Sequence, residues 1–279
     1  MGRYAKWSEA RIAQLEKEGY GQGVGEHYKP WIEVWDFSSI GDSYRISSRL
    51  TNRTHHFVSS IERDFFLLAE FSPDVIDIRE QFPLPRPDTL SIAATLGVQH
   101  PLYENTTIAT VMTTDFVITR ERNGNRWFEA YDCKPASAAS DARSIEKLEI
   151  QRRLFDSDGI SHRLVFDTKL PANKCANLYW VHKALLAEGE IEPYPGYFEE
   201  HCQRLLHDIQ NAKQQLSLTD YCTQYDRRTS ANTGTGLRVA RMLIKQRKLT
   251  TDLNQADLAS LPIAMFSAVL PGKLKVAGA

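Results

Sequence analysis

The spacing of apolar and polar side chains along residues 1–170 predicts alternating helices and strands. Residues 59–71 carry apolar side chains at helical spacing, begin with serines suited to a cap and are followed by Pro73. Val75 to Phe82 alternates apolar and polar residues, as a half-buried strand does. The same reading predicts helices at 8–18, 88–96 and 141–157, and strands at 32–36, 44–48, 111–119, 126–133 and 162–166. This order indicates an α/β or α+β core rather than a helical bundle or a β-sandwich.

The pattern beyond residue 171 is mainly helical, so we expect two domains, residues 1–170 and 171–279. A helix at 219–228, a polar turn at 229–236, a helix at 237–248 and a strand at 249–253 follow one another. A helix–turn–helix followed by a hairpin suggests a winged helix with its second helix in the recognition position. The alternative is a charged helix that packs against the first domain or against a partner protein.

The charges of the two parts differ in sign, although the formal net charge of the 279 residues is only −1. Residues 201–279 hold 11 Lys and Arg against 5 Asp and Glu, which gives +6 and leaves −7 for residues 1–200. One stretch of this basic part has no acid but seven basic residues: Arg227, Arg228, Arg238, Arg241, Lys245, Arg247 and Lys248. We expect these side chains to contact nucleic-acid phosphates. Each contact should contribute about 1 to the slope of log affinity against log salt concentration.

Composition excludes several other classes of protein. No apolar run approaches the roughly 18–20 residues of a membrane helix, and the charged N-terminal segment has no signal-peptide core. The four cysteines, Cys133, Cys175, Cys202 and Cys222, form no zinc-binding spacing, so we expect free thiols in the cytoplasm. The glycines at 21–25 match no phosphate-loop consensus and favour a flexible or closely packed loop. His55 and His56 would point to opposite faces of a strand, which favours a structural or DNA-phosphate role over a metal pair.

Asn123-Gly124 is a strong signal for a two-residue hairpin turn. If Arg122 pairs with Asn125, Asp115 falls directly opposite Asp132, with Cβ atoms about 4.5–5.5 Å apart. Lys134 would then share the face of Asp132. Like charges so placed require a cation, and carboxylate oxygens suit Mg²⁺.

An Asp followed by Asp-x-Lys is the pattern of metal-dependent nucleases. Asp-x-Lys occurs twice, but Asp167-Thr168-Lys169 has no partner across a hairpin, whereas Asp132-Cys133-Lys134 has one. Lys134 could help to deprotonate a water or stabilise charge on a phosphate. The alternative is a set of surface charges on an edge hairpin, and a bulge at the turn would remove the pairing.

Two helices could supply further groups to this site. Glu62 borders the apolar stripe of the helix at 59–71 and could reach the site from one side. Glu149 or Gln151, in the helix at 141–157, could support the metal indirectly. A solvent-exposed helix face is the alternative for each of them.

Several segments resemble the TnsA family of endonuclease subunits of heteromeric bacterial transposases. The similar stretches are EGYGQGVGEHYKPW (18–31), HHFVSSIERDFFLLAEF (55–71), DIREQFPL (77–84), MTTDFVI (112–118), DCKPA (132–136) and EKLEIQRR (146–153). They follow the family's order over most of residues 10–170. Residues 171–279 resemble it more loosely, in length and helix–turn–helix character.

The resemblance implies a restriction-endonuclease-like catalytic core and a winged-helix-like C-terminal domain. It implies Mg²⁺-dependent cutting of transposon-end DNA at the 5′ ends, with a TnsB-type DDE recombinase and a TnsC-type ATPase as partners. Carried over by position, Glu62 is the helix acid, Asp115 the central acid and Lys134 the catalytic lysine. Family members can have Gln where this chain has Asp132, and an acid where it has Gln151.

We therefore expect a metal-dependent endodeoxyribonuclease, with Mn²⁺ able to replace Mg²⁺. Asp115 and Asp132 would bind the metal, Glu62 would complete a second metal position, and the Cys133 carbonyl would add an oxygen. Glu149 would take the auxiliary place. The alternatives are a stand-alone restriction-like or junction-resolving nuclease, and a non-catalytic assembly protein that works through its basic domain.

Overall fold

We describe a computed structural model of the chain over residues 7–33, 43–187, 189–210, 212 and 215–269. It divides into two compact units, Met1–Leu170 and Pro171–Ala279, which we call the first and second units. No helix within the described residues is long and apolar enough to cross a membrane.

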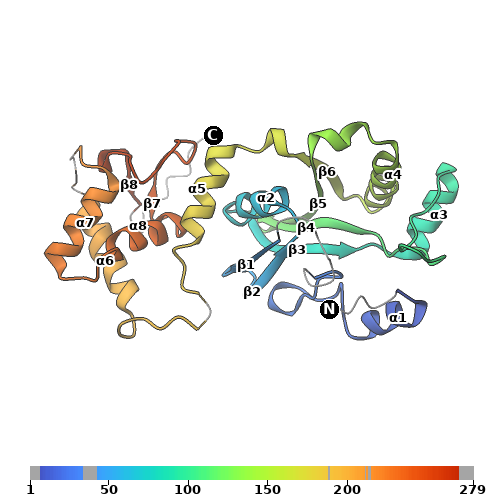
Figure 1. The fold of residues 1–279 in the computed structure, drawn as a ribbon, viewed down its shortest axis with the longest axis horizontal. Coiled ribbons are helices and arrows are strands. Elements are labelled where there is room, and N and C mark those ends of the chain that lie inside the picture. The colour runs from blue at the N-terminus through green and yellow to red at the C-terminus, as the bar shows by residue number, and fades with distance from the viewer. Residues whose placement is uncertain (1–6, 34–42, 188, 211, 213–214, 270–279) are drawn as a thin grey trace. The chain divides into compact units, whose positions relative to one another are not determined.

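The first unit is built on a four-stranded mixed sheet (Figure 1). Its order is β3 (Val75–Pro83), β4 (Thr113–Arg122), β5 (Asn125–Lys134) and β6 (Ser161–Phe166). The first two pairings are antiparallel, and β5 pairs with β6 in parallel. A separate hairpin joins β1 (Tyr44–Ser48) to β2 (Arg53–Phe57). The helices are α1 (Glu9–Lys17), α2 (Ser60–Glu70), α3 (Arg86–Leu96) and α4 (Ala142–Ser157).

Helices cover both faces of this sheet. The ring of Phe65 in α2 lies 5.2 Å from Phe116 of β4 and 4.7 Å from Tyr131 of β5, between ring centroids. Their neighbours Val117 and Ala130 pack instead in a core cluster with Ile150, Leu154 and Phe155 of α4. Because successive side chains of a strand point to opposite faces, α2 and α4 lie on opposite sides of the sheet.

The predicted elements of the first unit are confirmed, with small shifts at their ends. Ser8, Ser59 and Asp141 cap α1, α2 and α4, each by accepting a hydrogen bond from the backbone N–H of the third helix residue. The strand expected at 32–36 lies partly outside the described residues. The bounds of β2 were not predicted, although His55 and His56 were treated as strand residues.

The glycine-rich segment at 21–25 is a closely packed loop. A flexible or a closely packed loop was predicted, and the second alternative is confirmed. Gly21 has φ +76°, and a Cβ there would lie 2.1 Å from Pro83 Cγ. Gly23 has φ +93°, and its Cβ would lie 2.4 Å from the His27 carbonyl oxygen. Glycine fits both positions without a clash: Gly21 lies against Pro83 at the end of β3, and Gly23 lies against the backbone of the loop itself.

The second unit contains α5 (Ala172–His182), α6 (Tyr197–Gln210), α7 (Leu218–Thr229) and α8 (Thr235–Lys245). After α8, β7 (Leu249–Thr250) pairs antiparallel with β8 (Ser267–Ala268), so the strand predicted at 249–253 is two residues long. Helix α8 packs against α5, α6 and α7 (Figure 1). Its buried residues are Thr235, Gly236, Val239, Ala240, Met242, Leu243 and Ile244. It is therefore the central helix of this unit.

Candidate active site

The hairpin of β4 and β5 has the register that the sequence predicted. Asn123 and Gly124 form the turn with φ of 53° and 79°, and pairing runs from Arg122↔Asn125 to Phe116↔Tyr131. The paired stretch ends one step before Asp115 and Asp132. These two residues therefore lie where the regular ladder stops.

At this point the Asp115 carboxylate, rather than a backbone carbonyl of β4, accepts a hydrogen bond from the backbone of β5. Its Oδ2 accepts the Cys133 N–H at 2.7 Å and a hydrogen bond from Lys134 Nζ at 3.1 Å. The same ammonium lies 3.7 Å from Asp132 Oδ1. Lys134 thus stands between the two carboxylates, and it supplies the cation that the predicted juxtaposition requires.

Glu62 reaches this group from α2, where it is only 5% exposed. Its carboxylate accepts hydrogen bonds from Ser59 Oγ at 2.9 Å and from the Val58 N–H at 3.3 Å. Burial and the nearby charge of Asp115 raise the pKa of Glu62 to about 7. The alternative of a solvent-exposed Glu62 is therefore wrong.

Electrostatics show that the acids form one group. Burial and the charge of Asp132 raise the pKa of Asp115 to about 6. The pKa of the Cys133 thiol is raised by burial and by the charges of Asp115, Glu62 and Asp132. Burial alone would lower the pKa of Lys134, but Asp115 and Asp132 outweigh it and raise that pKa. The lysine consequently stays charged at neutral pH.

Asp132, 2% exposed, is held from three other elements. Its Oδ2 lies 2.7 Å from His162 Nε2 and accepts from Thr114 Oγ1 at 3.1 Å. Its Oδ1 has a longer contact, 3.5 Å, with Gln151 Nε2, which also donates to the Thr113 carbonyl. Sequence reasoning missed His162, because a parallel strand pairing leaves no local signal in the sequence.

The helix residue that reaches the site is Gln151, not Glu149. Glu149 pairs with Arg152 and Arg153 at 2.7 and 2.8 Å on the outer side of α4. These hydrogen bonds lower the pKa of Glu149 to about 2. The auxiliary role expected for Glu149 finds no support in its position.

The donor chemistry of this group fits a hard cation in part. Three carboxylates, two of them with raised pKa values, gather beside the Cys133 backbone, and such oxygens suit Mg²⁺. As placed, no three His, Cys, Asp or Glu side chains of the described residues are close enough to enclose a metal ion. The site therefore offers ligands of the right kind, with Lys134 at present between them.

Arg238 and Arg241, which were predicted to bind DNA, make contacts within the second unit. Arg238 lies over the Phe198 ring, pairs with Glu190 and donates to the Ala184 carbonyl. Arg241 lies over the Trp180 ring and donates to the Trp180 carbonyl. Both arginines therefore stabilise the second unit internally, and α8 lacks the exposed face of a recognition helix.

The other predicted DNA-binding residues are more accessible. Arg227, Arg228, Arg247 and Lys248 are exposed, and Lys245 is half-buried. Arg228 pairs with Asp208 at 2.9 Å while its side chain stays 57% exposed. A basic surface consequently remains at the ends of α7 and α8.

Two other features do not belong to the site. His55 is fully buried and binds Glu80 and Thr51, both at 2.7 Å, which confirms a structural role for it.

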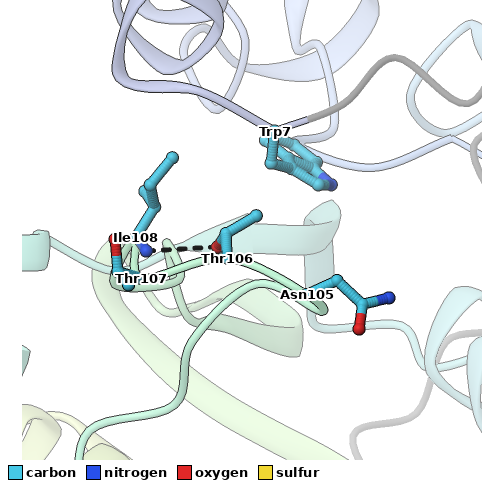
Figure 2. A pocket seen from close by; sticks show the side chains of 5 residues that line it. All are labelled: Trp7, Asn105, Thr106, Thr107 and Ile108. Carbon is cyan, nitrogen blue, oxygen red and sulfur yellow. Dashed lines mark hydrogen bonds between the residues drawn. The ribbon is translucent and has the colours of Figure 1, made fainter.

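Figure 2 shows a shallow hollow lined by Trp7, Asn105, Thr106, Thr107 and Ile108. Its lining offers no acid, base or metal ligand, so we assign it no chemistry.

Comparisons with known proteins identify the chain's family. A family model described as TnsA-like endonuclease N terminal matches residues 72–167, which include Asp115, Asp132 and Lys134. A model described as TnsA endonuclease C terminal matches residues 170–253. The transposon Tn7 transposition protein TnsA of Escherichia coli is 38% identical over 188 residues, covering 67% of this chain and 68% of that protein. The chain therefore belongs to the TnsA endonuclease family.

Proposed function

We propose that this protein is a Mg²⁺-dependent DNA endonuclease that nicks transposon 5′ ends during cut-and-paste transposition. The observation that carries the proposal is the group formed by Glu62, Asp115, Asp132 and Lys134. Membership of the TnsA endonuclease family supports it. The first unit would be a restriction-endonuclease-like core and the second unit a winged-helix-like domain.

Asp115 and Asp132 would hold Mg²⁺, or Mn²⁺ in its place, with the Cys133 carbonyl and Glu62 as further oxygen donors. When bound, the ion would polarise the scissile phosphate and lower the pKa of a bound water. Relief of carboxylate repulsion favours such binding, because burial and a neighbouring aspartate raise both pKa values: Asp115 acts on Glu62, and Asp132 acts on Asp115.

Lys134 would act on the phosphate itself. Its ammonium is charged, 30% exposed and held near both aspartates, so it can donate to a phosphate oxygen or orient the attacking water. Hydrolysis would add water across the phosphodiester bond and leave a 5′-phosphate and a 3′-hydroxyl.

The second unit would supply DNA or partner contacts. With Arg238 and Arg241 occupied, Arg227 and Lys248 are the exposed basic residues to which we assign phosphate contacts. Partners of TnsB type, a DDE recombinase, and TnsC type, an ATPase, would complete the transposase.

The test is strand-specific nicking of a transposon-end duplex with Mg²⁺ and the TnsB- and TnsC-type partners. We expect wild type to nick the 5′ end strand, and Asp115→Ala and Lys134→Ala to lose this activity. If both variants nick like wild type, the assignment of the site is wrong. Nicking without any partner would instead favour the stand-alone nuclease. Full transposition with both variants would favour a non-catalytic assembly protein.

A further inference from the structure

The strongest polar contact of Asp132 is with a side chain that no sequence motif indicates. His162 comes from β6, the strand parallel to β5, where it pairs with Ala130, two residues before Asp132. Its Nε2 lies 2.7 Å from Asp132 Oδ2, and its side chain is only 4% exposed. An ionised carboxylate only accepts hydrogen bonds, so Nε2 carries the proton in this contact.

The two oxygens of Asp132 are held unequally. Oδ2 contacts both His162 at 2.7 Å and Thr114 Oγ1 at 3.1 Å, and these come from the two strands that flank β5. Among the described residues, Oδ1 has only the longer contacts, 3.5 Å to Gln151 and 3.7 Å to Lys134. Oδ2 is thus held by residues of the two neighbouring strands, whereas Oδ1 faces Lys134 and has no short hydrogen bond among the described residues.

We propose that His162 is a positioning residue, which holds Asp132 by Oδ2 so that Oδ1 is presented to a divalent cation. This inference rests on the proposed function. Groups that hydrogen-bond a metal-binding side chain from behind typically contribute about 10–100-fold to metal affinity or activity. The ring of His162 packs on Phe155, with centroids 5.3 Å apart, which limits its movement.

The test is calorimetric titration of the full chain with Mg²⁺, with thermal unfolding in EDTA as a check on folding. We expect His162→Ala to weaken Mg²⁺ binding about 10–100-fold. His162→Gln keeps an N–H donor and should recover at least part of the affinity. In single-turnover nicking, His162→Ala should lower the rate at saturating DNA and leave the DNA concentration for half-saturation unchanged.

Phe155→Leu is the matched control, because it loosens the packing of the histidine ring without removing a contact to Asp132. It should lower the unfolding temperature and weaken Mg²⁺ binding less than His162→Ala does, because the contact between His162 and Asp132 remains. Thr114→Val removes the other donor to Oδ2 and gives a second, independent measurement. It should weaken binding less than His162→Ala does, because the shorter contact to His162 remains.

A double-mutant cycle separates this inference from the proposed function. If His162→Ala weakens Mg²⁺ binding equally in wild type and in Asp132→Ala, the effect does not pass through Asp132 and the inference is overturned. Equal affinities of wild type and His162→Ala also overturn it, and the proposed metal site still stands. Absence of Mg²⁺ binding by wild type overturns both.

Discussion

Lys134 Nζ lies 3.1 Å from Asp115 Oδ2 at the point where the β4–β5 ladder ends. The same oxygen accepts the Cys133 N–H at 2.7 Å, so the backbone of β5 and its lysine converge on one carboxylate. This arrangement keeps a charged amine inside a group of acids and raises its pKa despite burial. The lysine is therefore placed to act as a charged donor.

Removal of that amine should abolish most of the nicking activity. We expect Lys134→Ala to lower the single-turnover nicking rate by about 10²–10⁴-fold, because positioned proton donors and charge stabilisers contribute that much. Lys169→Ala is the matched control, since Asp167-Thr168-Lys169 repeats the same string. Asp167 there accepts backbone N–H groups of Ala136 and Thr168. If Lys169→Ala also lost activity, the effect of Lys134→Ala would not be specific to the site formed by Asp115, Asp132 and Lys134.

The buried acids should make the protein less stable at high pH when no divalent cation is present. Because burial and Asp115 raise the pKa of Glu62 to about 7 from 4.5, the folded state binds its proton more tightly than the unfolded state does. The stabilisation is complete below pH 4.5 and is lost as the pH rises through about 7. We expect Glu62→Gln to raise the free energy of unfolding at pH 8 in EDTA by about 1–3 kcal/mol.

Chemical denaturation of wild type and Glu62→Gln at pH 5 and pH 8 checks this expectation. The difference between the two proteins should shrink at pH 5, where Glu62 is protonated. Glu121→Gln serves as a control, because that acid is only half-buried and pairs with Arg126 at 2.7 Å. A Glu62→Gln variant that is less stable than wild type at pH 8 would contradict the prediction.

Local rules predicted much of the first unit. The Ser59 cap, the strand from Val75 and the Asn123-Gly124 turn each depend on residues close in sequence, and the structure has all three, although Glu80 and Gln81 of that strand are buried. The turn rule even placed Asp115 and Asp132 side by side, although the ladder ends before them. Contacts between distant segments could not be predicted in this way, which is why His162 was missed.

The second unit shows the other limit of sequence patterns. Its α8 has arginines at spacings typical of a solvent-exposed face, but Arg241 contacts Trp180 of α5, and Arg238 contacts the segment after α5 and Phe198 of α6. The guanidinium group of Arg241 lies over the Trp180 ring and also donates to the Trp180 carbonyl oxygen in α5. The number of basic residues therefore overstated the surface available to DNA.

Arginines that make contacts within the second unit and arginines that are exposed should differ in their effects on stability and on DNA binding. Arg238→Ala and Arg241→Ala should each lower the free energy of unfolding by about 1–2 kcal/mol, because partly buried carbonyl oxygens lose their donors. Neither should change the salt dependence of DNA binding. Arg227→Ala should leave stability near wild type and reduce the slope of log affinity against log salt by about 1.

Fluorescence anisotropy of a labelled duplex at several salt concentrations measures this slope, and thermal unfolding measures stability. If Arg241→Ala changes the slope while Arg227→Ala does not, the face of α8 contacts DNA after all. That outcome would require α5 to move away from α8 when DNA binds.

Glu80 should control the stability of the first unit in acid. It is 1% exposed, and its carboxylate binds Arg53 and His55, each at 2.7 Å. Burial alone would raise the pKa of Glu80, but the charges and hydrogen bonds of His55 and Arg53 outweigh burial and lower that pKa well below 4.5. The folded state thus favours the ionised form, and its contribution to stability is complete above pH 4.5.

This contribution should be lost as the pH falls below 4.5 toward the lowered pKa. We expect Glu80→Gln to reduce the free energy of unfolding at pH 7 by about 3–5 kcal/mol, because Arg53 is left buried without its counter-charge. Between pH 4.5 and pH 2 the variant should lose less stability than wild type, since it has no carboxylate to protonate. Urea denaturation at pH 7, 4 and 3 measures both effects, and parallel pH profiles of the two proteins would show that Glu80 is not the group responsible.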